Sequence, residues 1–166
     1  MMLPLSSQTL EGAYRMPATS PGRPVEILLV EDTPDDADLM IEALKEGTFA
    51  PRVTVVEDGE EAMDYLHRHG AYAAALTPDL ILLDLHLPRK NGHEVLAEIK
   101  EDALLRRIPV VILTASDNET AILKAYDLRA NCCVTKPANL EQFALAVKRI
   151  ETFWLQTVRH AWRDAP

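Results

Sequence analysis

The chain has 166 residues, of which 26 are acidic and 17 are lysine or arginine, so its formal net charge is −9 at pH 7. This negative charge argues against nucleic acid or an anionic membrane as the main partner, and no run approaches the roughly 18 apolar residues of a membrane span. The length suits one domain with a core of its own. The adjacent Cys132 and Cys133 are poorly spaced for a disulfide framework or a zinc site, and residues 1–16 lack the features of a signal peptide, so we expect a cytoplasmic protein.

Residues 1–23 are predicted to form a flexible N-terminal tail, because they are rich in serine, proline, glycine and threonine and show no helical or strand periodicity. A folded domain is predicted over residues 24–158, including an extended last helix. Residues 159–166 are expected to form the end of that helix and a C-terminal tail. Too few residues follow the last helix for an output domain, so the chain is expected to act as a stand-alone domain through its own surface.

Along the folded region, short apolar runs alternate with amphipathic segments. The apolar runs are typical of strands covered on both faces of a parallel sheet; they span residues 25–30, 53–56, 80–84, 108–113 and 132–135. Helical patterns follow each run; they begin near residues 34, 59, 94, 117 and 140, and the last continues to about residue 162. Ser116 and Glu119 have the spacing of a capping box, which predicts that the fourth helix starts after Ser116. The alternation predicts an α/β fold with a doubly wound, five-stranded parallel sheet and right-handed crossovers.

Polar side chains follow four of the five predicted strands. Glu31 and Asp32 follow the first, Asp84 ends the third, and Thr114 and Lys136 follow the fourth and fifth. Because the carboxyl ends of parallel strands meet at one edge of a sheet, we expect these side chains to converge. Three crowded carboxylates repel one another unless a cation intervenes, and an all-oxygen set of ligands suits Mg²⁺.

The predicted cluster has the groups that phosphoryl transfer requires. Asp84 is the candidate nucleophile, since a carboxylate can take a phosphoryl group as an aspartyl phosphate. Lys136 and the metal would offset charge on the phosphoryl oxygens, and Thr114 would donate a hydrogen bond to one of them. Each residue alone has a structural alternative as a capping or turn residue; the order of all of them at successive strand ends favours the functional interpretation.

Four short motifs follow one another along the chain: Glu31-Asp32, Asp84, Thr114-Ala115 and Lys136-Pro137. Together they resemble the motif set of the receiver domain of two-component response regulators. The resemblance covers about residues 25–157. The resemblance implies a CheY-like fold with the strand order 2-1-3-4-5. It implies that Asp84 is phosphorylated by the phosphohistidine of a sensor histidine kinase and that Mg²⁺ is required, with Mn²⁺ as an alternative ion.

The resemblance also implies roles for individual residues. The metal ligands would be Glu31, Asp32, Asp84 and the backbone carbonyl of His86. The phosphoryl group would contact Lys136, Thr114 and the backbone of Ala115, and Thr114 would carry the switch. The Lys136–Pro137 peptide would be cis, as is common in this family. His86 and Ser116 lie two residues after Asp84 and Thr114, at positions that modulate the lifetime of the aspartyl phosphate in this family. His86 would shield or orient the attacking water; the alternative is that it has no such role.

Within the family, residues 87–92, 130–132 and 150–155 are similar to segments of the small regulators that are paired with cyanobacterial and bacterial phytochromes. This similarity implies a phytochrome, a red-light receptor, as the kinase. A histidine phosphotransfer protein is a further candidate partner, if the phosphoryl group is passed onward.

The chain departs from the family at Cys133, where receivers usually have tyrosine or phenylalanine three residues before the lysine. A thiol cannot sweep the volume of an aromatic ring, so the coupling between Thr114 and this position is expected to be altered. Phosphorylation would then be read through movement of residues 115–119. The alternative is that Cys133 is a small strand residue without a switch role.

The predicted last helix, from Asn139 to Trp162, would be about 36 Å long at ~1.5 Å per residue, longer than the strands. Apolar side chains near its end exceed what the sheet needs for cover and predict a partner or dimer surface; they include Phe153, Trp154, Val158 and Trp162. We expect a homodimer through the fourth and fifth helices. The alternative is that these side chains fold back against the domain.

Two other functions fit parts of the pattern. A pseudo-receiver would bind partners without being phosphorylated, but the intact Asp32, Asp84 and Lys136 argue against it. A phosphohydrolase of the haloacid dehalogenase type also orders aspartate, threonine and lysine after strands. That family has a second aspartate two residues after the nucleophile, where this chain has His86, and takes its metal-binding acids from downstream. The protein is therefore not expected to be an enzyme beyond its own phosphorylation and dephosphorylation.

Overall fold

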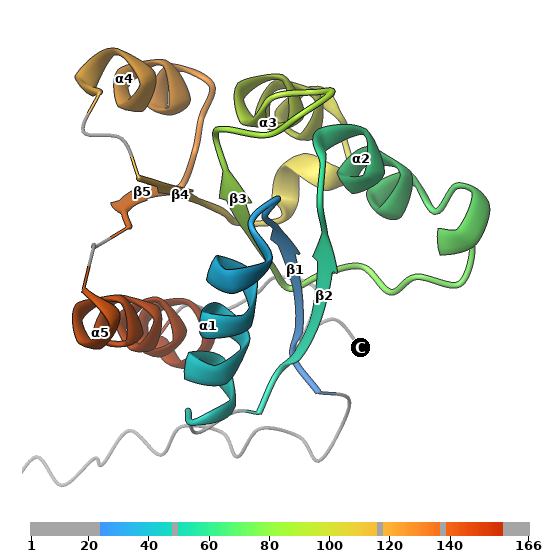
Figure 1. Cartoon of the computed structure of the whole chain (residues 1–166). Coiled ribbons are helices and arrows are strands. Elements are labelled where there is room, and N and C mark those ends of the chain that lie inside the picture. The colour runs from blue at the N-terminus through green and yellow to red at the C-terminus, as the bar shows by residue number, and fades with distance from the viewer. Residues whose placement is uncertain (1–23, 48–49, 116–117, 137–138, 158–166) are drawn as a thin grey trace, which may run out of the picture.

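The computed structural model describes residues 24–47, 50–115, 118–136 and 139–157, which form a five-stranded parallel sheet (Figure 1). The strands lie in the order β2-β1-β3-β4-β5, and every neighbouring pair is parallel. Their bounds are β1 Glu26–Val30, β2 Arg52–Val56, β3 Leu80–Asp84, β4 Val110–Thr114 and β5 Cys132–Thr135. The predicted fold class and strand order are confirmed.

Helices cover both faces of the sheet (Figure 1). They are α1 Pro34–Lys45, α2 Gly59–His67, α3 Gly92–Glu101, α4 Glu119–Asp127 and α5 Leu140–Glu151, with short 3₁₀ turns at Gly70–Tyr72 and Leu105–Arg107. α1 and α5 lie on one face, and α2, α3 and α4 lie on the other. Within the described residues, no helix combines the length and the apolar character needed to cross a membrane.

The central strand β3 explains why its sequence is a continuous apolar run. Leu80 and Leu82 pack into the cluster beneath α1 and α5, whereas Ile81 and Leu83 pack into the cluster beneath α2, α3 and α4. All four side chains are fully buried. Because successive side chains of a strand point to opposite faces, a strand between two helical layers must be apolar at every position.

Two helices begin at other residues than the sequence pattern predicts. α4 begins at Glu119, because Asn118 is its N-cap and accepts hydrogen bonds from the N–H groups of Thr120 and Ala121 at 3.0 and 3.3 Å. The prediction of a start after Ser116 is therefore wrong, and Ser116 itself lies outside the described residues. α3 begins at Gly92, two residues before the predicted start, with Asn91 as a capping-box N-cap. Asparagine caps a helix as well as serine does, so several candidate caps compete in these loops.

The end of the last helix also differs from the prediction. The α-helix ends at Glu151, and residues Thr152–Thr157 form a π-helix up to the last described residue. Trp154 is only 8% exposed and belongs to the cluster beneath α1 and α5, so the prediction that it lies on an exposed surface is wrong. Phe153 is 53% exposed, and its ring meets that of Trp154 edge to face at 5.1 Å between centroids.

The difference has a packing cause: the cluster beneath α1 and α5 continues past the end of the α-helix and includes Trp154. Val158 and Trp162, the other residues of the predicted surface, lie outside the described residues.

A buried aspartate holds the start of β3 against β1. The N–H of Asp79 donates to the carbonyl of Glu26 at 2.7 Å, and its Oδ2 accepts from the N–H of Glu26 at 2.9 Å. We expect Asp79→Ala to lower the free energy of unfolding by about 1–3 kcal/mol, because it leaves the Glu26 N–H without this acceptor in the interior. Asp79→Asn keeps a carbonyl oxygen and should lose less. Urea titrations followed by circular dichroism measure both variants, and equal losses would contradict the expectation.

Candidate phosphorylation and metal site

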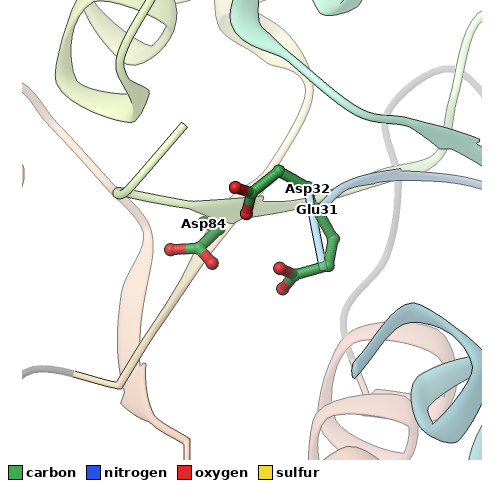
Figure 2. A group of neighbouring side chains, drawn as sticks. All are labelled: Glu31, Asp32 and Asp84. Carbon is green, nitrogen blue, oxygen red and sulfur yellow. The ribbon is translucent and has the colours of Figure 1, made fainter. Parts of the chain in front are cut away.

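Three carboxylates converge at the carboxyl edge of the sheet. Glu31 and Asp32 follow β1 and Asp84 ends β3, and Figure 2 shows their carboxylates turned toward a common space. One oxygen from each lies within 4.8 Å of the others. Glu31 and Asp84 are buried, whereas Asp32 is exposed at the mouth of the group. The structure thus brings together the three acids that the sequence pattern placed at one edge.

Lys136, directly after β5, reaches into this acidic group. Its Nζ lies 3.0 Å from Oδ2 of Asp84 and 3.3 Å from Oδ2 of Asp36, and it also forms a short ion pair with Glu31. The lysine side chain is only 7% exposed. Its charge is therefore balanced by the carboxylate that follows β1, by one in the first turn of α1 and by the one that ends β3.

Asp36 is a member of the site that the sequence analysis did not identify. Asp36 lies in the first turn of α1, where an acidic residue is explained by its favourable interaction with the helix dipole. Nothing in the sequence pattern therefore assigned it to the site. The signal that points to the site is its spacing. Asp36 lies four residues, or one helical turn, after Asp32. It is in the first turn of α1, close in sequence to the end of β1.

The acids and the lysine shift each other's protonation. Burial raises the pKa of Glu31, and the hydrogen bond and charge of Lys136 offset this rise in part. Burial acts to lower the pKa of the Lys136 ammonium, but its hydrogen bonds with Glu31 and Asp84 and their charges outweigh burial and raise it above its ordinary value. Lys136 therefore remains charged at neutral pH.

Asp84 is held in one orientation by its neighbours. Its Oδ1 accepts from the N–H of His86 at 3.0 Å, and its Oδ2 accepts from Lys136 at 3.0 Å. Behind it, the N–H of Gly92 donates to the carbonyl of Leu85 at 3.0 Å. A Cβ at Gly92 would lie 2.3 Å from the backbone oxygen of Asp84, so only glycine fits there without moving the chain. The side chain of His86 is exposed.

Thr114 and Ala115 lie at the end of β4. Thr114 is buried, and its carbonyl accepts from the N–H of Lys136 at 2.7 Å, which joins the ends of β4 and β5. Ala115 is exposed. The structure does not describe Ser116 or Pro137, so the lifetime-modulating role of Ser116 and the cis peptide before Pro137 remain predictions.

Cys133 lies in β5, at the place where the sequence departs from the receiver pattern. It is partly buried and packs against the cluster beneath α2, α3 and α4, and its N–H donates to Oη of Tyr126 at 3.3 Å. Burial raises the pKa of the Cys133 thiol and that of the neighbouring Cys132, and both are free thiols. Neither therefore has the lowered pKa of a reactive cysteine.

The set of donor atoms fits a hard divalent cation. The three converging side chains offer only carboxylate oxygens, and one of them is exposed. Mg²⁺ binds through one or two carboxylates and keeps several waters, so a partly open group of this kind suits it. The buried Glu31 and Asp84 would supply charge, and the exposed Asp32 leaves room for water or phosphate.

The sequence matches a known family over most of its length. Residues 27–148 match the response regulator receiver domain. Over 135 residues the chain is 48% identical to response regulator Rcp1 of Synechocystis sp. (strain ATCC 27184 / PCC 6803 / Kazusa), which covers 81% of this chain and 92% of Rcp1.

Solved structures show the same similarity. The crystal structure of the phosphorylated cyanobacterial phytochrome response regulator RcpA superposes with a TM-score of 0.81 at 53% identity, covering 84% of this chain and 99% of RcpA. The Mn²⁺-bound form of Rcp1 superposes with a TM-score of 0.79 at 47% identity, covering 82% and 99%. The bacteriophytochrome response regulator RtBRR gives 0.64 at 43% identity, covering 76% and 78%.

Proposed function

Because this chain belongs to the family of response regulator receiver domains, we propose that Asp84 accepts a phosphoryl group from the phosphohistidine of a sensor histidine kinase. The observation that carries the proposal is the position of Asp84. It ends the central strand, both of its oxygens accept hydrogen bonds, and the Lys136 ammonium lies 3.0 Å from one of them. Receiver domains of this kind are signalling proteins, and the chemistry proposed here acts on the protein itself.

The transfer is a displacement at phosphorus. An Oδ of Asp84 forms the new P–O bond while the P–N bond to the kinase histidine breaks, and the imidazole leaves with the electron pair of that bond. Lys136, already beside Asp84, would offset the charge on the phosphoryl oxygens. Thr114 ends the neighbouring strand β4, and Ala115 follows it. The Thr114 hydroxyl and the Ala115 N–H would donate hydrogen bonds to the same phosphoryl oxygens.

Glu31, Asp32, Asp84 and the backbone carbonyl of His86 would hold Mg²⁺, with Mn²⁺ as the alternative; the latter is supported by the Mn²⁺-bound structure of Rcp1. The ion would supply positive charge to stabilise the phosphoryl oxygens during transfer. Glu31 and Asp84 would orient it from the buried side, and the exposed Asp32 would hold it at the opening of the site.

The proposed kinase is a phytochrome. The support is the similarity to RcpA and to RtBRR, which are named as phytochrome and bacteriophytochrome response regulators. A histidine phosphotransfer protein is a further candidate partner. The proposal places the protein in the cytoplasm, with neither nucleic acid nor membrane as a partner, in keeping with its negative charge and free cysteines.

A homodimer through α4 and α5 is part of the proposal. Exposed apolar side chains on both helices support it, since Leu123 of α4 is 63% exposed and Leu145 of α5 is 49% exposed. Phe153, just beyond α5, is a further exposed apolar side chain, whereas the buried Trp154 does not contribute to the surface. Light scattering at tens of micromolar, with and without phosphorylation, tests this element; a monomeric mass in both states would contradict it.

The experiment that tests the proposed function is intact-mass spectrometry after incubation with acetyl phosphate and Mg²⁺. We expect the wild type to gain one phosphoryl group and Asp84→Asn to gain none, because the amide cannot form the acyl phosphate. Asp64→Asn is the matched control, since Asp64 is an exposed aspartate on α2 away from the site, and it should be phosphorylated normally. A folded wild type that gains nothing would favour a pseudo-receiver that binds partners without phosphate.

A further inference from the structure

Helix α4 is held to the domain by few buried side chains. Of its residues, Ala125 is fully buried, whereas Leu123 and Tyr126 are 63% and 48% exposed. Polar contacts reach it from two neighbouring elements. Nε2 of His93 in α3 donates to the carbonyl of Ala121 at 2.9 Å, and the N–H of Cys133 in β5 donates to Oη of Tyr126 at 3.3 Å. An element with little buried area and exposed hydrogen bonds opens at a low free-energy cost.

The contact between Tyr126 and Cys133 gives a backbone N–H of an edge strand a hydrogen-bond acceptor. β5 is an edge strand, so the backbone groups on its outer side have no neighbouring strand. The Tyr126 hydroxyl supplies an acceptor for one of its N–H groups. Position 133 itself carries a thiol in place of a ring, so the aromatic group beside this strand comes from α4.

β4 is the rigid element through which a change at the site would reach α4. It is buried along its whole length and paired with β3 and β5. Thr114 ends it, and Asn118, the N-cap of α4, follows four residues later. A movement of Thr114 and Ala115 toward a phosphoryl group on Asp84 would act on the start of α4, which has fewer buried side chains than β4.

We propose that Tyr126 is the positioning residue that couples α4 to the phosphorylation site, through the hydrogen bond between its hydroxyl and the N–H of Cys133. The bond holds α4 against β5 in the unphosphorylated protein and opens when Thr114 and Ala115 move toward the phosphoryl group. This inference rests on the proposed function. Its consequence is that phosphorylation frees the Tyr126 hydroxyl and a β5 N–H on the same exposed face as Leu123.

Amide hydrogen exchange of the full chain, measured by NMR, tests the inference. The probe is beryllofluoride with Mg²⁺, which mimics a phosphoryl group on a carboxylate. We expect the Cys133 amide of the wild type to exchange at least about tenfold faster with the probe than without it. The Asn131 amide is the internal control, because it donates to the carbonyl of Val110 in β4 at 3.0 Å and not to α4; its exchange should stay unchanged.

Two variants separate the hydroxyl from the thiol. In Tyr126→Phe, the Cys133 amide should exchange at the fast rate with and without the probe. Acetyl phosphate should still add one phosphoryl group, at least as readily as in the wild type, because no hydrogen bond has to open. In Cys133→Ala, which keeps the backbone N–H, the exchange of residue 133 should remain sensitive to the probe. A wild-type rate in Tyr126→Phe would overturn the inference.

The outcomes also distinguish this inference from the proposed function. If the Ala115 amide shifts with the probe but exchange at Cys133 does not change, the role of Tyr126 is wrong and the proposed function stands. If the amides of Asp84 and Ala115 do not respond to the probe at all, the proposed function fails, and the role of Tyr126 fails with it.

Discussion

Replacing Lys136 by methionine is expected to lower the free energy of unfolding by about 3–5 kcal/mol at about pH 8 without divalent metal, because it removes one partner of a buried ion pair. The Lys136 side chain is 7% exposed, and its ammonium lies among Glu31, Asp36 and Asp84. Methionine preserves much of the volume and flexibility of the side chain, so the loss reports the charge. Without it, two buried carboxylates face each other with no cation between them.

The loss should depend on pH in a defined direction. Burial already raises the pKa of Glu31 in the folded protein, and Lys136 offsets this in part; in the variant the offset is lost and the pKa rises further. An acid whose folded pKa is raised binds its proton more tightly when folded, so its contribution to stability is present at low pH and is lost as the pH rises through the folded pKa. The destabilisation should therefore be smaller at about pH 5.5 than at about pH 8.

Urea titrations of Lys136→Met at both pH values, with and without Mg²⁺, measure these effects. Mg²⁺ should recover part of the lost stability, since a cation bound by the same carboxylates stabilises the folded state that binds it. Lys124→Met on α4 is the control, because Lys124 is exposed; its effect should stay within about 0.5 kcal/mol. The same loss at both pH values, with no recovery by Mg²⁺, would contradict the proposed arrangement.

Trp154→Ala is expected to lower the free energy of unfolding by about 3–5 kcal/mol, the range for a large aromatic side chain removed from a core. Trp154 is 8% exposed and belongs to the cluster beneath α1 and α5. The adjacent Phe153 is 53% exposed, so Phe153→Ala should change stability by about 0.5 kcal/mol or less, apart from the lost ring contact. Two neighbouring aromatic residues thus provide a matched pair.

Thermal and urea unfolding of the two variants measure this difference. A large loss in Trp154→Ala beside a small one in Phe153→Ala would show that the segment after α5 is part of the core. Equal losses would mean that the Trp154 ring does not pack as described. Trp154→Phe should fall between wild type and alanine, because it keeps an aromatic ring but leaves a cavity.

The sheet and the acidic group could be predicted from the sequence because the rules involved are local. Each strand is a short apolar run, and the residue after each run necessarily lies at the same edge once the strands are parallel. Glu31, Asp84 and Lys136 could therefore be placed together without knowledge of any long-range contact. Strand β5 was predicted at Cys132–Thr135 with the bounds that the structure has.

The surroundings of the site could not be predicted in the same way. Helical periodicity indicates that one of two adjacent aromatic residues faces inward, but it does not show how far the core extends along the helix. Trp154 is buried because the core extends past the end of α5. Asp36 contacts Lys136, which is 100 positions away in the sequence. Tyr126 contacts Cys133, which is 7 positions away but belongs to another element. Such contacts depend on where a helix is docked, and the sequence pattern fixes only that the helix exists.

The cluster beneath α1 and α5 joins the first helix of the chain to the last. Met40 and Leu44 share it with Phe143, Val147 and Trp154. During synthesis roughly 95 residues separate the end of α1 from the start of α5, a delay of about 5–20 s at about 5–20 residues per second. The opposite face of the sheet needs α2, α3 and α4, which leave the ribosome earlier. The part of the cluster that α5 covers therefore stays exposed on the nascent chain until α5 has been synthesised, and this is a surface that a chaperone at the ribosome exit would meet.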